Sequence, residues 1–163
     1  MTGFTVSDVV NITGGVLHGG GSGAPVTGGV IDSRAVKPGE LFCALRGERV
    51  DGHEYIARAL AAGASACLAE RVPEGVEGPV IVVPDVTAAM AALASECRRR
   101  FSGPVVGIVG SSGKTTAKEL CARVLGEKYK VLYTEGNLNN ELGVPLTLFR
   151  LDGGTEAAVI ELG

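Results

Sequence analysis

Residues 105–116 read Val-Val-Gly-Ile-Val-Gly-Ser-Ser-Gly-Lys-Thr-Thr, and this stretch decides the fold expected for the chain. The apolar run at 105–109 predicts a buried strand, the small residues at 110–113 predict a turn, and residues 114–125 have the composition of a helix. A phosphate-binding loop requires this order, because the free N–H groups and positive dipole end of a helix start converge on the phosphates. The stretch therefore predicts a nucleotide site.

The residues of this turn have separate expected tasks. Lys114 would reach the terminal phosphates of a nucleotide, and the hydroxyl of Thr115 would hold Mg²⁺. The longer general motif also needs a glycine five residues before Gly113, where this chain has Ile108. The alternative is a Gly/Ser turn followed by a chance Lys-Thr, but the flanking strand and helix favour the nucleotide site. The expected nucleotide-binding residues are Gly110, Ser111, Ser112, Gly113, Lys114, Thr115 and Thr116.

The composition is that of a folded chain and excludes several classes of protein. Of the 163 residues, 45% are hydrophobic and 20% charged, which indicates a soluble globular protein rather than a disordered one. The net charge of −3 gives no reason to expect a nucleic-acid partner. No apolar run approaches the length of a membrane span, and the N-terminus lacks the basic and apolar regions of a signal peptide.

The cysteines stand far apart in the sequence and include no C-x-x-C pair. Each lies in an apolar segment predicted as strand or helix: Cys43, Cys67, Cys97 and Cys121. This pattern favours buried reduced thiols over a metal site or disulfides. We therefore expect a cytoplasmic protein.

Residues 1–83 predict a small α/β unit. Thr5 and Asp8 have capping-box spacing at the start of a short helix. One predicted strand ends in three polar residues at 32–34, and a polar loop at 46–53 follows another. Strand-end loops are where α/β units bind ligands. On composition alone, the first of these clusters fits a solvated surface equally well. The predicted strands are 16–18, 29–34, 41–45, 65–69 and 80–83, and the second predicted helix is 54–62.

Pro84-Asp85 marks the expected boundary, and a helix that ends near Arg100 follows it. The last predicted strand ends on Glu161. An acid at the tip of a strand beside a phosphate loop can bind the Mg²⁺ of a nucleotide. The alternative is an ordinary strand-end carboxylate. The other elements predicted here are a strand at 130–134, a polar loop with three asparagines at 135–141, a short helix from about Gly143 and a strand at 157–160.

Together these segments resemble the Mur ligases of peptidoglycan synthesis. In that family the loop reads Gly-x-x-Gly-Lys-Thr-Thr, which accounts for Ile108, although Val109 stands where many relatives have Thr. Residues 136–148 are similar to the loop and helix of the branch that adds D-Ala-D-Ala. The segments similar to the family's uridine-nucleotide-binding N-terminal domain are 32–34, 38–42, 45–48 and 51–53.

The resemblance implies an α/β fold with residues 1–83 as a UDP-substrate-binding domain. Residues 84–163 would be an incomplete P-loop ATP-binding central domain with a mainly parallel sheet, and the C-terminal domain would be absent from this chain. The implied enzyme is an ATP-dependent amide ligase that joins D-Ala-D-Ala to UDP-N-acetylmuramoyl-tripeptide through an acyl phosphate. The fragment is expected to be inactive alone, and the unpaired edge of its truncated sheet predicts self-association.

The resemblance also assigns roles to individual residues. The implied catalytic residues are Lys114, Asn139 and Glu161, and those implied for Mg²⁺ are Thr115 and Glu161. The implied substrate-binding residues are Ser33, Arg34, Arg46, Gly47, Glu48, Asp51, His53, Asn137 and Asn140.

Two other classes of function stay open on the sequence. A P-loop small-molecule kinase or nucleotide hydrolase would share the phosphate loop and the metal acid, but it explains neither residues 1–83 nor the asparagine loop. A non-catalytic UDP-sugar-binding module would bind UDP ligands without turning over ATP.

Overall fold

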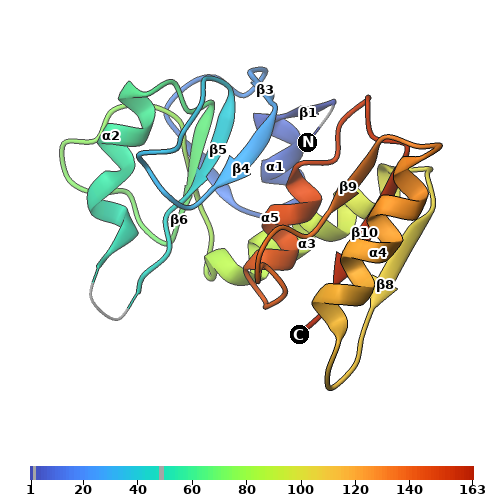
Figure 1. The fold of residues 1–163 in the computed structure, drawn as a ribbon. Coiled ribbons are helices and arrows are strands. Elements are labelled where there is room, and N and C mark those ends of the chain that lie inside the picture. Colours follow the sequence, from blue (N-terminus) through green and yellow to red (C-terminus); the bar gives the residue numbers. More distant parts are fainter. Residues whose placement is uncertain (2, 48–49) are drawn as a thin grey trace. The chain divides into compact units, whose positions relative to one another are not determined.

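The computed structural model describes residues 1, 3–47 and 50–163. They form two compact units, Met1–Leu93 and Ala94–Gly163, each with its own β-sheet (Figure 1). The predicted α/β class is confirmed.

The division between the units falls inside α3 (Val86–Arg100), the helix that the sequence predicts after Asp85. The Asp85 carboxylate accepts a hydrogen bond from Ala88 N at 2.9 Å, which caps the start of this helix. Its three terminal arginines lie in the last turn, where positive charge suits the helix dipole. The domain limits expected from the sequence, 1–83 and 84–163, stay a prediction.

The first unit is built on a sheet of five strands: β2 (Val16–His18), β4 (Gly28–Val30), β5 (Glu40–Cys43), β6 (Ala66–Ala69) and β7 (Val80–Val82). The strand order is β2-β7-β6-β5-β4, with β2 antiparallel at one edge and the other strands parallel. The central strand β6 is buried at every position, which explains its continuous apolar sequence. A separate antiparallel pair joins β1 (Phe4–Thr5) to β3 (Pro25–Val26).

The first helix, α1 (Val6–Thr13), has the predicted capping box. Thr5 Oγ1 accepts a hydrogen bond from Asp8 N, and the Asp8 carboxylate accepts one from Thr5 N at 2.8 Å. Gly14 ends the helix in the left-handed conformation, with φ 67°. The predicted start of this helix is therefore confirmed.

The strand predicted at 41–45 ends early, at Cys43. Two further boundaries in the first unit are wrong because of aspartate residues. The strand expected at 29–34 ends at Val30, because Asp32 forms a turn: its side-chain Oδ1 accepts a hydrogen bond from Arg34 N, and its backbone carbonyl accepts one from Ala35 N. The helix expected at 54–62 begins earlier, as a 3₁₀ turn η1 (Gly52–Tyr55) that continues into α2 (Ile56–Ala61). Asp51 caps that turn.

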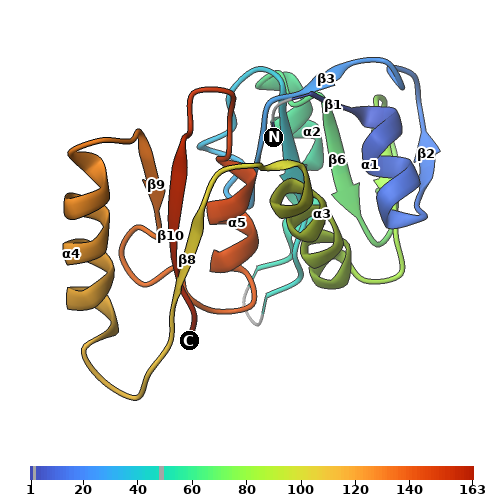
Figure 2. The same ribbon diagram turned by 90° about the vertical axis from the view of Figure 1, so that its right-hand side faces the viewer.

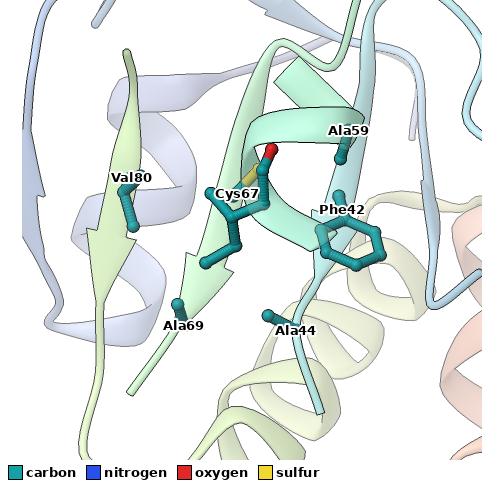
Figure 3. Packing of buried hydrophobic residues seen from close by; sticks show 7 residues of the cluster. Phe42, Ala44, Ala59, Cys67, Ala69 and Val80 are labelled. Atoms are coloured by element: carbon teal, nitrogen blue, oxygen red, sulfur yellow. The ribbon is translucent and has the colours of Figure 1, made fainter. Parts of the chain in front are cut away.

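The core of the first unit lies where α2 packs on the sheet. Phe42, Cys67 and Val80 come from three neighbouring strands, and Figure 3 shows them gathered with Ala59 of the helix. The full cluster consists of Phe42, Ala44, Ile56, Ala59, Cys67, Ala69 and Val80. Small side chains predominate in this core, so the helix can approach the sheet closely.

The second unit contains a parallel sheet of three strands: β8 (Val105–Ile108), β9 (Val131–Tyr133) and β10 (Ala157–Glu161). Figure 2 shows β10 between the other two strands, and its residues are buried along its whole length. The helix α4 (Lys114–Gly126) follows β8, and α5 (Gly143–Phe149) precedes β10. The mainly parallel sheet expected for this region is confirmed.

The burial predicted for the strand at 105–109 is wrong. Its residues are half-buried or exposed, and the Val109 side chain is 72% exposed. The physical reason is position, since β8 lies at an edge of the described sheet whereas β10 is covered by a strand on each side. Within the described residues, no helix is both long enough and apolar enough to cross a membrane.

All four cysteines are free thiols, and all except the half-buried Cys121 are buried. Burial raises the pKa of Cys67 to about 12 and that of Cys97 to about 11. These thiols therefore stay protonated and unreactive at neutral pH.

Candidate nucleotide and metal site

The parallel register brings three predicted site segments to one edge of the second sheet, the edge formed by the carboxyl ends of its strands. Glu161 at the end of β10 pairs with Ile108 at the end of β8, so it lies beside the start of the loop at 109–113. Thr134 follows β9 directly, and its Oγ1 accepts a hydrogen bond from Glu161 N at 3.0 Å. In open α/β sheets, ligands bind outside the carboxyl ends of the strands. The fold therefore places a candidate site at this edge.

The loop between β8 and α4 has the conformation that phosphate binding requires. Gly113 has φ 72° and ψ 4°, a left-handed turn that favours glycine, and α4 begins at the next residue. Among the described residues no side chain caps this helix start, so its first N–H groups are open to an anion. Lys114 Nζ donates to Gly110 O at 2.8 Å, which keeps the ammonium at the loop. The other predicted loop residues are exposed: Ser111, Ser112, Thr115 and Thr116.

A buried ion pair joins α4 to the end of β10. Lys118 is 1% exposed and Glu161 is 2% exposed, and Lys118 Nζ lies 3.4 Å from Glu161 Oε2. Asn139 Nδ2 donates to the other carboxylate oxygen, Oε1, at 2.8 Å. Lys118 Nζ also donates to Gly136 O at 3.3 Å. Lys118 therefore connects the predicted metal ligand to the asparagine loop.

The Glu161 carboxylate is ionised but incompletely hydrogen-bonded. Burial raises its pKa, but the hydrogen bond from Asn139 and the nearby Lys118 ammonium and Thr115 hydroxyl outweigh burial and lower the pKa overall. Its Oε2 atom is buried and accepts no hydrogen bond from the described residues. Leaving a buried charged oxygen without a donor costs free energy, so this oxygen is the atom most suited to a cation.

The donor chemistry of this corner fits Mg²⁺. Thr115 and Glu161 both offer hard oxygen atoms. Thr115 lies in the first turn of α4, directly after the loop that begins beside Glu161. The described residues contain no group of three His, Cys, Asp or Glu side chains that could hold a metal by themselves. Mg²⁺ is commonly held by one or two protein oxygens together with water and substrate phosphates. The site therefore suits a metal that binds with a nucleotide.

The three asparagines of the polar loop have different surroundings. Asn139 binds the carboxylate of the ion pair, as described above. Asn140 Oδ1 accepts a hydrogen bond from Gly143 N at 2.8 Å and so helps to start α5. A Cβ at Gly143 would lie 2.4 Å from Leu138 Cα, so this approach requires glycine. The side chain of Asn137 is exposed.

Sequence reasoning missed Lys118. The residue lies four positions after Lys114, which is one helical turn, so both lysines face the same side of α4. That spacing could have predicted the role of Lys118, because a lysine one turn after the phosphate-loop lysine faces the predicted strand ends. Its burial was not expected, since lysine is almost never buried unless it is paired.

The predicted uridine-site residues lie in the first unit, where the turn after β4 carries two of them. Ser33 is 8% exposed. Arg34 is exposed and forms a two-pronged ion pair with Asp32, with Nη2 at 2.7 Å from Oδ2. The hydrogen bonds from Arg34 hold the pKa of Asp32 at about 2. The turn therefore presents a fixed guanidinium at its surface.

The second polar loop of this unit is closed at its base. Arg46 and Asp51 form an isolated antiparallel bridge, and Gly47 N donates to Val50 O at 2.9 Å. Glu48, which the sequence also predicts as a substrate-binding residue, lies outside the described residues. The predicted members Arg46, Gly47 and Asp51 are thus brought together in one loop.

His53 holds this loop from inside the protein. Its side chain is 1% exposed, and its Nδ1 lies 2.6 Å from Asp51 Oδ1. Its other nitrogen, Nε2, accepts a hydrogen bond from Glu70 N at 3.0 Å, which places the ring proton on Nδ1. Arg71 Nη2 donates to Asp51 Oδ2 at 2.9 Å. Both ring nitrogens are therefore engaged within the protein, and this geometry gives His53 a positioning role.

Comparison with known families agrees with this geometry. Residues 108–163 match the Mur ligase middle domain, and residues 25–98 match the catalytic domain of the Mur ligase family. The chain belongs to the Mur ligase family, as its sequence motifs predict.

The relatives that it resembles include MurF ligases. The UDP-N-acetylmuramoyl-tripeptide–D-alanyl-D-alanine ligase of Escherichia coli (strain K12) is 42% identical over 165 aligned residues, which is 100% of this chain and 35% of that protein. A crystal structure of MurF from Acinetobacter baumannii is 36% identical with a TM-score of 0.85, over 98% of this chain and 36% of that one. MurF from Thermotoga maritima, solved in complex with ADP, is 40% identical with a TM-score of 0.72. That match covers 85% of this chain and 32% of the Thermotoga maritima chain. The chain thus spans about a third of the length of these relatives.

Proposed function

We propose that this chain carries the UDP-substrate-binding region and part of the ATP-binding region of a ligase that joins D-Ala-D-Ala to UDP-N-acetylmuramoyl-tripeptide. The observation that carries this proposal is the set of groups at the carboxyl ends of the strands in the second unit. There, α4 begins without a side-chain cap and carries Thr115 in its first turn. Glu161, at the end of β10, is ionised, and its Oε2 has no hydrogen-bond donor among the described residues. The names of the MurF relatives supply the substrates.

The proposed reaction has two steps. ATP first transfers its γ-phosphoryl group to the terminal carboxylate of the tripeptide, which yields an acyl phosphate and ADP. The amine of D-Ala-D-Ala then attacks the acyl carbon, and phosphate leaves as the amide forms and the amine loses a proton. A free carboxylate is a poor electrophile because its oxide is a poor leaving group, so phosphorylation supplies the activation.

Little covalent chemistry falls to the protein in such a reaction, so its residues position groups and neutralise charge. The loop backbone at 110–113 and the start of α4 would hold the phosphates, with Lys114 as the neutralising cation. Mg²⁺ held by Thr115 and Glu161 would neutralise phosphate charge. Asn139 would orient Glu161 through the bond to Oε1.

The first unit would hold the uridine diphosphate of the substrate. Support comes from Arg34, whose exposed guanidinium is fixed by Asp32 and can bind a phosphate. The residues proposed to contact or shape the substrate site are Ser33, Arg34, Arg46, Gly47, Glu48, Asp51, His53, Asn137 and Asn140. We assign this activity to the cytoplasm, where reduced buried thiols persist.

Self-association is part of the proposal. β8 and β9 form the edges of the described three-stranded sheet, and Val109, Leu120 and Val124 are more than half exposed. Unpaired strand edges beside apolar surface favour pairing between copies. Light scattering across a concentration series should show a rising mass, and a constant monomer mass would contradict this.

Calorimetric titration of the chain with Mg²⁺-ADP and, separately, with UDP-N-acetylmuramoyl-tripeptide tests the proposed function. Lys114→Ala should abolish nucleotide binding and leave the UDP ligand unaffected, because the two lie on different units. The matched control is Lys128→Ala, which replaces an exposed lysine after α4. This variant should bind both ligands normally. Nucleotide binding without any affinity for the UDP ligand would overturn the ligase proposal and favour a kinase or hydrolase.

A further inference from the structure

We propose that Lys118 makes metal binding at Glu161 conditional on the nucleotide. Its ammonium neutralises the Glu161 carboxylate while no nucleotide is bound and thereby weakens the binding of a free divalent cation. The inference rests on the proposed function, in that Thr115 and Glu161 are taken as the metal residues. It goes beyond that function because it assigns a task to a lysine outside the phosphate loop.

The first support is that Lys118 is fixed in place. Its side chain is 2% exposed, and its Nζ is held between Gly136 O at 3.3 Å and Glu161 Oε2 at 3.4 Å. An exposed lysine would move aside when a cation arrived, because its long side chain is flexible and solvated. Lys118 is enclosed by its own helix and the strand end, so its charge stays beside the carboxylate.

The second support is that Lys118 and a metal would compete for the same oxygen. Oε1 of Glu161 already accepts the hydrogen bond from Asn139, and Oε2 is the atom without a donor. Oε2 is also the oxygen that Lys118 faces. A divalent cation at Oε2 would therefore meet a positive charge across one carboxylate, and like charges this close repel even in a water-like dielectric.

The third support is the charge balance of the corner. The described residues offer no cluster of three acidic or other metal-binding side chains, so Lys118 and Glu161 together leave almost no net charge to attract a cation. Phosphates at the loop would add several negative charges and supply metal ligands directly. The metal would then bind with the nucleotide rather than before it, which prevents a free cation from occupying the empty site.

The test measures Mn²⁺ affinity of the whole chain by electron paramagnetic resonance of the free ion, with and without ADP. Lys118→Met removes the charge but keeps an unbranched side chain of similar length. It should tighten nucleotide-free Mn²⁺ binding by on the order of tenfold, the repulsion expected between a divalent and a monovalent cation at such separations in water. The gain in Mn²⁺ affinity on adding ADP should shrink accordingly.

Three matched variants make the result specific. Lys118→Arg keeps the charge and should retain the weak nucleotide-free affinity, and Lys128→Met removes an exposed charge elsewhere and should change nothing. Glu161→Gln should abolish the Mn²⁺ binding gained in Lys118→Met. If Lys118→Met does not fold, Lys118→Gln, which is neutral and can still bond to Gly136 O, carries the same expectation.

A purely structural lysine would give the opposite result, because its loss would disorder Glu161 and weaken Mn²⁺ binding. Unchanged or weaker nucleotide-free affinity in a folded neutral variant at position 118 overturns the inference. If Glu161→Gln nevertheless weakens Mn²⁺ binding with ADP, the proposed function survives that outcome. If Glu161→Gln has no effect on Mn²⁺ binding in any background, the metal assignment itself is wrong and both proposals fail.

Discussion

Each unit of the molecule contains a carboxylate that is paired with a cation near the ends of parallel strands, and the two pairs differ in how completely they are satisfied. In the first unit, Asp51 accepts bonds from His53 on one oxygen and from Arg71 on the other. In the second unit, Glu161 receives a bond from Asn139 on Oε1, whereas the buried Oε2 accepts none from the described residues.

The difference separates a structural cluster from a ligand site. The charge of a carboxylate whose oxygens both have donors is already compensated within the protein, so Asp51 serves to hold its loop in shape. A buried ionised oxygen without a donor carries a desolvation cost that a bound cation would relieve. Strand-end position alone does not distinguish the two cases, since both clusters follow parallel strands.

The largest effect on stability is expected from Lys118→Ala. Removing this lysine leaves the Glu161 charge buried and uncompensated, which costs about 3–5 kcal/mol for buried pairs in general. Urea unfolding of the variant chain measures the loss. The double variant Lys118→Ala/Glu161→Gln should recover much of it, because replacing both charges is far less costly than removing one. A loss as small as that of an exposed lysine would contradict the burial of this pair.

The sequence predicted much of the fold where local chemistry acts alone. The capping box at Thr5, the start of α4 at Lys114 and the end of β10 at Glu161 are confirmed. The errors at Asp32 and Asp51 arose because those side chains bond to nearby backbone and form turns that apolar periodicity does not reveal.

The candidate site was less predictable than the fold. The phosphate-loop residues form a continuous motif, so they were found from sequence spacing. The pairing of Lys118 with Glu161 joins residues 43 positions apart, and it depends on β10 lying beside β8 in one register. The positioning role of His53 likewise depends on a hydrogen bond from Glu70, a residue at the end of another strand. Contacts of this kind follow from tertiary register, which no single-sequence pattern encodes.

A smaller effect is expected from His53→Ala in the satisfied cluster. The substitution leaves Glu70 N without its acceptor and removes the ring donor to Asp51 Oδ1, although the backbone N of residue 53 still donates to that oxygen. An unsatisfied buried group costs about 1–3 kcal/mol. Urea unfolding should show this loss while Mg²⁺-ADP binding stays normal, because the nucleotide site lies in the other unit. His53→Asn is the matched control, since its amide can still donate to Asp51. Equal destabilisation by both variants would mean that ring packing, and not hydrogen bonding, holds the loop.

The pH dependence of stability sharpens the comparison further. Hydrogen bonds from His53 N, the His53 ring and Arg71 lower the pKa of Asp51 in the folded chain. The stabilisation is therefore fully present above the unfolded value of about 4 and is lost as the pH falls through the lower folded value. The free energy of unfolding should decline on acidification below about pH 5, and Asp51→Asn should show a shallower decline. Parallel curves for the two proteins would rule out Asp51 as a contributor.

The smallest effect on stability is expected from Arg34→Ala, and that makes it the sharpest probe of substrate binding in the first unit. Arg34 and Asp32 are exposed enough for water and salt to screen their attraction, so losing the pair should leave the unfolding curve almost unchanged. A fall in affinity for UDP-N-acetylmuramoyl-tripeptide would then report a lost contact rather than a damaged fold. Arg58→Ala, which removes an exposed arginine of α2, is the matched control and should bind normally. If both variants lose affinity equally, the guanidinium of Arg34 acts only through the general charge of this surface, and the uridine diphosphate must be held by the loop at 46–53 instead.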